Sequence, residues 1–105
     1  MDSQMKKGMY DYLVLSAVRG EPSYGYKIIQ NLEGVADISE STLYPILRRL
    51  EEQNALTTNS VAISGRLRKY YVITEAGKER LREFKEEWKR MSKIADYILR
   101  RNEVL

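Results

Sequence analysis

Three cations lie close together in the second half of the sequence: Arg66, Arg68 and Lys69, which two tyrosines follow directly. No acidic residue lies between Val61 and Thr74. Guanidinium and ammonium groups bind the phosphates of nucleic acids and enter the minor groove. The segment therefore predicts contact with a nucleic-acid backbone. The alternative is a hairpin whose charges only protect its edges from aggregation.

A second candidate segment, SESTLYPILRRLEEQN, occupies residues 39–54. Its aliphatic residues have the i, i+3, i+4, i+7 spacing of an amphipathic helix: Leu43, Ile46, Leu47 and Leu50. Pro45 is expected at the margin of the first turn, where its missing N–H costs little. The spacing predicts a helix that starts around Ser39 to Ser41 and buries all four aliphatic side chains.

The opposite face of this helix carries hydroxyl groups and a guanidinium. At about 100° per residue, Ser41, Pro45, Arg48 and Glu52 point away from the aliphatic face, with Thr42, Tyr44 and Arg49 on its flanks. Hydroxyls bond either base-edge partner, arginine grips guanine with two bonds, and a helix N-terminus favours phosphate. An ordinary solvated helix surface is the alternative. The clustered hydroxyls and the guanidinium make this face a candidate for contact with nucleic acid.

The elements that must position these side chains follow from apolar periodicity and turn residues. We expect helices over 9–18, 24–34 and about 39–54, strands over 56–63 and 67–73, and a last helix from Glu75 to about Asn102 that Thr74 caps. Gly34 suits the left-handed end of the second helix. A helix pair followed by a basic hairpin is the plan of a winged helix-turn-helix, whose later helix enters the major groove. The predicted class is mainly α with a small β-hairpin: a winged helix-turn-helix over 1–74 and a dimerisation helix over 75–105, in one compact unit.

The last helix carries apolar residues at alternating spacings of three and four, which is a heptad seam: Leu81, Phe84, Trp88, Met91, Ala95 and Ile98. At 1.5 Å per residue the helix would run about 40 Å, longer than the winged domain can cover. Part of the seam is therefore expected to meet a second copy of the chain. Such a homodimer would present two recognition helices to half-sites about 34 Å apart, on a palindromic operator.

Composition excludes several classes of function. The 105 residues, 43% hydrophobic and 31% charged, suit one folded domain, and the net charge is +3. The chain has no cysteine and no histidine, which excludes Cys/His zinc sites, disulfides, thiol nucleophiles and imidazole catalysis. No phosphate-binding glycine loop is present. We expect no enzyme activity, metal or cofactor, and, since no membrane segment or signal peptide is evident, a cytoplasmic protein. A winged-helix protein–protein adaptor without DNA binding is the alternative function.

Three blocks of the sequence resemble the PadR family of transcriptional regulators: SYGYKI at 23–28, STLYPILRRLEEQNAL at 41–56 and GRLRKYYVITEAG at 65–77. The resemblance implies a cytosolic bacterial repressor with a winged helix-turn-helix and a dimerising C-terminal helix. It places recognition contacts at Ser41, Thr42, Tyr44 and Arg48, and hairpin contacts at Arg66, Arg68 and Lys69.

The phenolic-acid-sensing members carry a longer helical C-terminal domain, whereas this sequence has one predicted helix after the hairpin, so we expect it to resemble the short PadR group. In multidrug-sensing members of that group, a tryptophan on this helix stacks planar hydrophobic drugs between the subunits. Trp88 resembles it in position, which implies a planar effector at Trp88, Phe84 and Tyr10. The alternative is that Trp88 only packs the dimer core.

Overall fold

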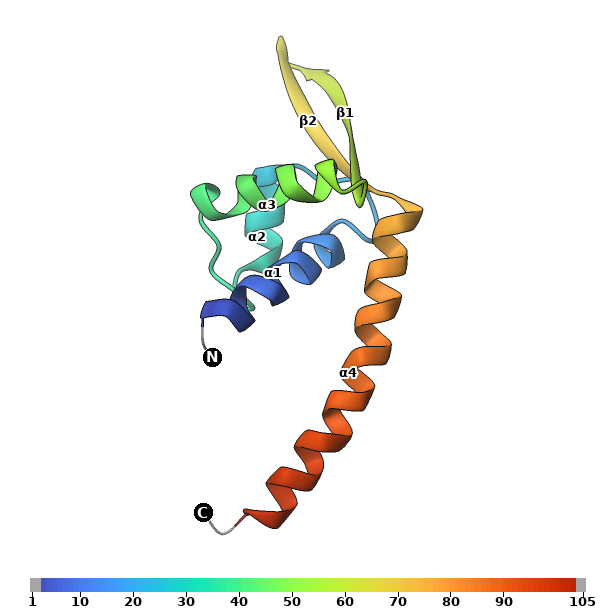
Figure 1. Cartoon of the computed structure of the whole chain (residues 1–105). Helices are drawn as coiled ribbons and strands as arrows, with labels where there is room; N and C mark the ends of the chain where they lie inside the picture. Colours follow the sequence, from blue (N-terminus) through green and yellow to red (C-terminus); the bar gives the residue numbers. More distant parts are fainter. Residues whose placement is uncertain (1–2, 104–105) are drawn as a thin grey trace.

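The computed structural model describes residues 3–103, with side chains from residue 8 onwards. The elements along the chain are α1 (Ser3–Ala17), α2 (Gly25–Leu32), α3 (Glu40–Glu52), β1 (Leu56–Ile63), β2 (Arg66–Ile73) and α4 (Glu75–Arg101). Helices α1 to α3 pack together, the β1–β2 hairpin projects from one side of them, and α4 runs away on the other (Figure 1). The predicted class, mainly α with one hairpin, is confirmed. The two predicted regions, 1–74 and 75–105, include residues 1–2 and 104–105, which lie outside the described residues.

The first helix begins earlier than the sequence predicted, at Ser3 rather than residue 9. Gly8 directly precedes the predicted start at residue 9, but it lies inside α1. A single glycine costs a helix only about 1 kcal/mol relative to alanine. Good helix formers on both sides of Gly8 offset that cost, so the helix continues through it.

The hydrophobic core lies where α1, α2, α3 and the base of the hairpin meet. All four aliphatic residues of α3 are buried, as the spacing predicted. Val14 and Leu15 come from α1, Val18 from the turn directly after it, and Ile28 from α2. This packing fixes the rotation of α3 about its own axis, because turning the helix would expose its aliphatic face.

Local capping explains where α2 ends and where α3 begins. Gly34 has the predicted left-handed conformation, with φ of 84°. Ser39 caps α3 by accepting a hydrogen bond from the Thr42 amide. The helix starts at Glu40, within the predicted range, so Pro45 is its sixth residue, just past the first turn. Since Pro45 has no N–H, the Ser41 carbonyl loses its intrahelical hydrogen-bond donor. Ser41 is exposed, so a water molecule can donate to this carbonyl instead.

The hairpin is antiparallel, with a register from Leu56 opposite Ile73 to Ile63 opposite Arg66. Its turn contains only Ser64 and Gly65, both with positive φ (51° and 79°), as a type I′ turn requires. The sequence suggested that Arg66 also belongs to the turn, but Arg66 pairs with Ile63 as the first residue of β2.

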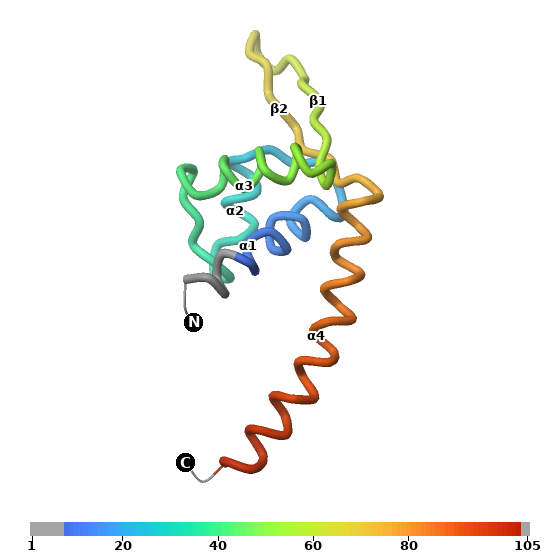
Figure 2. Tube along the Cα trace, in the orientation of Figure 1, coloured from blue at the N-terminus to red at the C-terminus, as the bar shows by residue number. Residues whose placement is uncertain are grey.

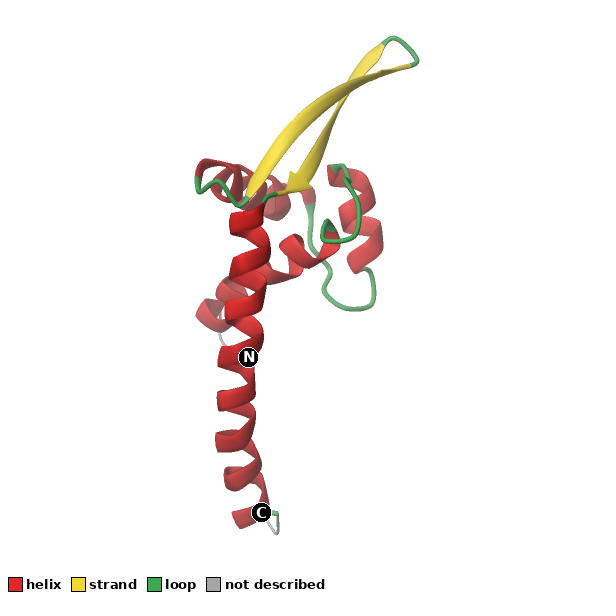
Figure 3. Ribbon diagram, turned by 90° about the vertical axis from the view of Figure 1, so that its right-hand side faces the viewer, coloured by secondary structure: helices red, strands yellow, loops and turns green. Residues whose placement is uncertain are grey.

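The segment before α2 attaches the hairpin to the helices. The Ser23 amide donates to the Tyr71 carbonyl at 3.1 Å, and the Tyr71 amide donates to the Ser23 carbonyl at 2.7 Å. These two bonds make Ser23 an isolated antiparallel bridge to β2. Figure 3 shows this loop at the base of the hairpin, where it sets the direction in which the hairpin projects.

Helix α4 starts at a tightly packed corner. Thr74 caps it, as predicted, by accepting from the Gly77 amide at 3.0 Å, and its hydroxyl donates to the Asn54 carbonyl at 2.6 Å. A Cβ at Gly77 would lie 2.7 Å from Ile73 Cγ1 and would also collide with the Ala55 carbonyl oxygen. Beyond this corner α4 packs on α1, and its C-terminal half then runs clear of every other described element (Figure 2).

Replacing Gly77 by alanine tests this corner. Although alanine is the better helix former, the added methyl group must displace backbone and a core side chain. We expect Gly77→Ala to lower the free energy of unfolding by about 1–3 kcal/mol, measured by urea unfolding at one protein concentration. The matched control is Gly20→Ala, because Gly20 has no heavy atom within 4 Å of a built Cβ. Its effect should stay within about 0.5 kcal/mol. A Gly77→Ala protein as stable as the unmodified chain would contradict the packing described.

Candidate nucleic-acid interface

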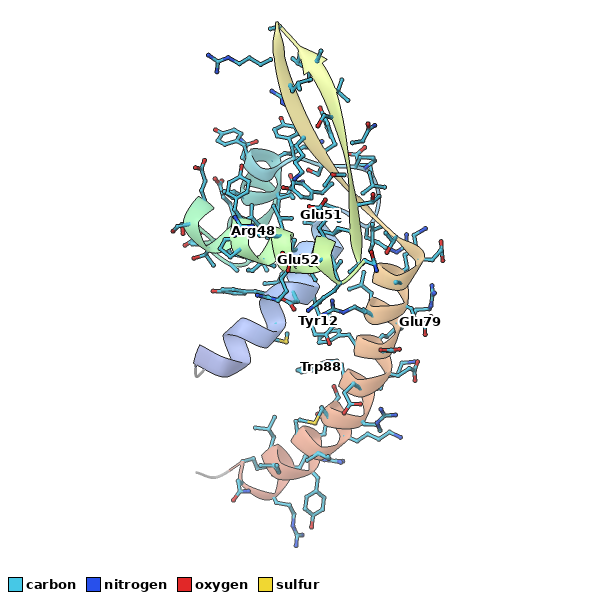
Figure 4. The ribbon with its side chains drawn as sticks, turned by 45° about the horizontal axis from the view of Figure 1, so that its top comes forward. Tyr12, Arg48, Glu51, Glu52, Glu79 and Trp88 are labelled. Atoms are coloured by element: carbon cyan, nitrogen blue, oxygen red, sulfur yellow. The ribbon has the colours of Figure 1, made fainter. Side chains whose placement is uncertain are left out.

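The outer face of α3 is polar and accessible. Ser41, Thr42, Tyr44 and Arg48 are all exposed, as the helical spacing predicted. Arg48 points out from α3 (Figure 4) and forms no ion pair with any described residue. The face therefore offers two hydroxyls, a phenol and a free guanidinium to an external partner.

Three hydroxyl groups gather at the N-terminus of α3. The Ser39 hydroxyl lies 3.0 Å from Ser41 Oγ and donates to Thr42 Oγ1 at 3.2 Å. Backbone N–H groups of a first helical turn and the helix dipole favour negative charge at this end. Ser39 was missing from the predicted contacts, although it was recognised as a possible helix start. The arrangement can donate hydrogen bonds to a phosphate or to a base edge.

The three cations of the hairpin are not equivalent. Arg66, beside the turn, is exposed and forms no ion pair with a described residue. Arg68 lies over the Tyr24 ring, 4.2 Å from its centroid. Lys69 Nζ lies 3.6 Å from Glu51 Oε1 of α3 and 5.5 Å from the Tyr71 ring centroid. Of the three, only Lys69 is paired with an acid, whereas Arg66 has neither an acidic nor an aromatic partner among the described residues. Arg68 and Lys69 also hold the hairpin against the helices.

An open groove of about 760 Å³ separates the hairpin from the starts of α2 and α3. It brings together four of the predicted contact residues, Tyr44, Arg66, Arg68 and Lys69, while Ser41, Thr42 and Arg48 lie beyond it on α3. Tyrosines supply much of the remaining wall. The full lining is Tyr24, Gly25, Tyr26, Tyr44, Ile63, Ser64, Arg66, Leu67, Arg68, Lys69 and Tyr71.

Tyr24 and Gly25, which the sequence-based prediction missed, shape the floor of this groove. The Tyr24 ring packs edge-on against Tyr70, with centroids 5.5 Å apart. Tyr24 therefore contacts two side chains of β2, the Tyr70 ring and the Arg68 guanidinium. A Cβ on Gly25 would lie 2.9 Å from Tyr44 Cζ. Only glycine lets Tyr44 lie against the start of α2. Both residues lie in the SYGYKI block, which was the only sequence signal for them.

Tyr71 closes the groove from below. Its ring is buried, and burial raises the pKa of its phenol above the ordinary value, against an opposing effect of Lys69. The higher pKa keeps the phenol neutral, so it adds no negative charge beneath the cations of the hairpin.

Arg49, on the flank of the predicted contact face, turns inward instead. Its guanidinium pairs with Asp11 of α1. Arg80 of α4 reaches the second oxygen of the same carboxylate, with Arg80 Nη2 3.4 Å from Asp11 Oδ2. Arg49 is therefore a link between helices rather than part of the exposed face.

The seam predicted on α4 divides into two parts. Leu81 packs against the hydrophobic core, and Phe84 stacks on Tyr12 of α1 with ring centroids 4.4 Å apart. Trp88 follows, 6.3 Å from Phe84 at an interplanar angle of 15°. The structure places Tyr12, not the predicted Tyr10, beside this aromatic pair (Figure 4). Tyr10 packs against the core, because two residues on a helix lie about 200° apart.

The remaining seam residues have no cover in the single chain. Trp88 is 56% exposed, Met91 50% and Ile98 53%. Ile94, which the heptad spacing did not include, is 56% exposed beside them. We call this surface the α4 stripe; its members are Trp88, Met91, Ile94, Ala95 and Ile98. No helix within residues 3–103 is long and apolar enough to cross a membrane.

Comparison with known proteins agrees with this geometry. Residues 14–83 match the transcriptional regulator PadR-like family. Similar solved structures include a PadR-like transcription factor from Bacteroides fragilis, 38% identical over 91% of this chain and 95% of that one, with a TM-score of 0.83. A PadR-like transcriptional regulator from Bacillus cereus is 36% identical, covering 92% and 97% (TM-score 0.79). One from Eggerthella lenta is 34% identical, covering 91% and 86% (TM-score 0.81). Among curated proteins, none matches the chain.

Proposed function

Because the chain belongs to the PadR-like family of transcriptional regulators, we propose that it is a homodimeric repressor that binds a palindromic operator and releases it in response to a planar ligand. The family and its solved relatives are DNA-binding regulators and not enzymes. The observation that carries the proposal is the polar outer face of α3 beside a groove with cations from the hairpin. Action on a chromosome agrees with the predicted cytoplasmic location.

In this proposal the N-terminal half of α3 enters the major groove and the hairpin acts as the wing. Ser41 and Thr42 contact phosphates or base edges at the helix N-terminus, and Arg48 reads a guanine. Tyr44 lies at the mouth of the groove, where its phenol can bond a phosphate. Arg66 contacts the backbone or minor groove next to the recognised bases. Arg68 and Lys69 are the weaker contacts, since Tyr24 and Glu51 already engage them.

Arg48→Ala tests the recognition helix. A lost bidentate contact with guanine should reduce discrimination between the operator and a scrambled duplex about tenfold or more. The measurement is fluorescence anisotropy at two salt concentrations, with duplexes that span many promoters.

Arg66→Ala should instead weaken binding to all duplexes alike. It should also lower the slope of log affinity against log salt concentration by about one, because one phosphate contact is lost. Arg82→Ala, an exposed arginine paired with Glu79 on α4, is the control. Absence of binding to any duplex at low salt would overturn the proposal in favour of the protein–protein adaptor.

The α4 stripe supports the homodimer. Its side chains are about half exposed in the single chain, and a long helix with an uncovered apolar face requires a partner surface. The a/d-like spacing of Trp88, Met91, Ala95 and Ile98 suits packing against the same seam of a second copy.

A charge placed in the stripe should separate the subunits. We expect Ile98→Glu to shift the protein from dimer to monomer at micromolar concentration, measured by sedimentation velocity. Lys93→Glu is the matched control, because Lys93 lies on the opposite side of α4 and is exposed. The unmodified chain sedimenting as a monomer, or Ile98→Glu remaining a dimer, would contradict the assignment of the stripe.

Trp88 supports the response to a planar ligand. One face of its ring stacks toward Phe84, which itself lies on Tyr12, while more than half of the indole stays accessible. Two such indoles near a two-fold axis would form a slot for a flat, hydrophobic or cationic molecule.

The slot is tested with a flat aromatic cation such as ethidium. Because Trp88 is the only tryptophan, saturable quenching of indole fluorescence in the confirmed dimer reports binding directly. The ligand should also weaken operator binding, whereas Phe84→Leu should reduce the quenching affinity. No quenching in a confirmed dimer leaves Trp88 as a residue of the dimer core and refutes the ligand response.

A further inference from the structure

Asp11 joins three helices through a single carboxylate. It lies on α1, and its side chain is only 15% exposed. Arg49 of α3 donates to Oδ1, and Arg80 of α4 donates to Oδ2 at 3.4 Å. Each carboxylate oxygen therefore holds a guanidinium from a different helix.

Arg80 makes a second contact with α3. Its Nη1 donates to Gln53 Oε1 at 2.8 Å, and Gln53 is the C-terminal cap of α3. The Arg80 guanidinium thus contacts the C-terminal end of α3 directly, at Gln53. Through Asp11 it is also linked to Arg49, one turn earlier in α3. We call Asp11, Arg49, Gln53 and Arg80 the Asp11 junction.

The junction is continuous with the apolar surface of α4. Arg80, Phe84 and Trp88 follow one another at intervals of four residues, so they form one row along the helix. On α1, Asp11 contacts the first member of this row and Tyr12 the second. The row begins beside the recognition helix and ends in the α4 stripe.

Partly buried ion pairs of this kind contribute more to geometry than to stability. Removing the groups from water offsets much of the Coulombic attraction, whereas hydrogen bonds between guanidinium and carboxylate restrict both distance and angle. The apolar core holds α3 against α1 and α2, but α4 meets α3 chiefly at this corner. A polar clamp there restricts rotation between α3 and α4 that apolar contacts alone would permit.

We infer that Asp11 and Arg80 are positioning residues that fix the recognition helix relative to α4 and so set the operator half-site spacing that the dimer accepts. The inference rests on the proposed function, because α4 would define the two-fold axis and α3 the DNA contact. Neither residue touches DNA in this scheme. Without the Asp11 junction, the dimer should accept operators with other distances between their half-sites. Ser41, Thr42 and Arg48 would still contact each half-site as before.

The test uses the full chain and an operator selected by that chain from a random duplex pool. Duplexes with the spacer between half-sites changed by one or two base pairs are compared with the selected one. For Asp11→Asn and Arg80→Gln we expect spacer discrimination to fall at least about fivefold, while the penalty for a base change inside one half-site and the dimer dissociation constant stay unchanged. Glu79→Gln is the matched control, since Glu79 pairs with Arg82 on the exposed side of the same helical turn (Figure 4).

The outcomes separate the two levels of the proposal. An equal loss of affinity for every spacer, or full retention of discrimination in both variants, would overturn the positioning role. If Asp11→Asn fails to fold, Arg80→Gln decides, because it leaves the pair between Asp11 and Arg49 intact. An unmodified chain that binds no duplex at low salt refutes the DNA-binding proposal itself, whatever the variants do.

Discussion

The burial of one face of α3 is the constraint on which the rest of the structure depends. Four aliphatic residues on that face pack into the core. Rotating the helix would expose them, at a cost of roughly 25 cal/mol per Å² of apolar surface. The polar residues opposite them must therefore face outward. Ser23 and Thr74 then attach the hairpin and α4 to the same core through backbone and capping hydrogen bonds. The fold thus presents the polar face of α3, the hairpin and α4 in one fixed relation.

The sequence predicted those features that depend on local periodicity. The aliphatic face of α3, the hairpin and the capped start of α4 were all evident from spacing and turn residues, and the structure contains each of them. The start of α1 was wrong, because a single glycine does not end a helix whose neighbours favour it. Tyr10 was chosen over Tyr12 because the side of α1 that faces α4 depends on packing between distant segments.

The ion pairs could not be predicted from the sequence either, because they too depend on packing between distant segments. Asp11, Arg49 and Arg80 are far apart along the chain, and nothing in their local spacing indicates that they meet. Lys69 looked like a free cation because no acid lies near it in sequence, yet Glu51 of α3 lies beside it in space. The sequence therefore suggested which residues form the candidate interface, but not which of their charges are free and which form ion pairs within the fold. Arg48 and Arg66 are free of ion pairs with described residues, whereas Arg49 and Lys69 form them.

A distance measurement between the two recognition helices addresses the whole scheme at once. The chain has no cysteine, so Ser41→Cys introduces a unique attachment site for a spin label at the N-terminus of α3. In a homodimer built on the α4 stripe, double electron–electron resonance should give one narrow distance distribution centred near a turn of B-DNA, about 34 Å. A broad distribution, or no dipolar signal at concentrations where the protein should be dimeric, would contradict a rigid dimer that presents two recognition helices to a palindromic operator.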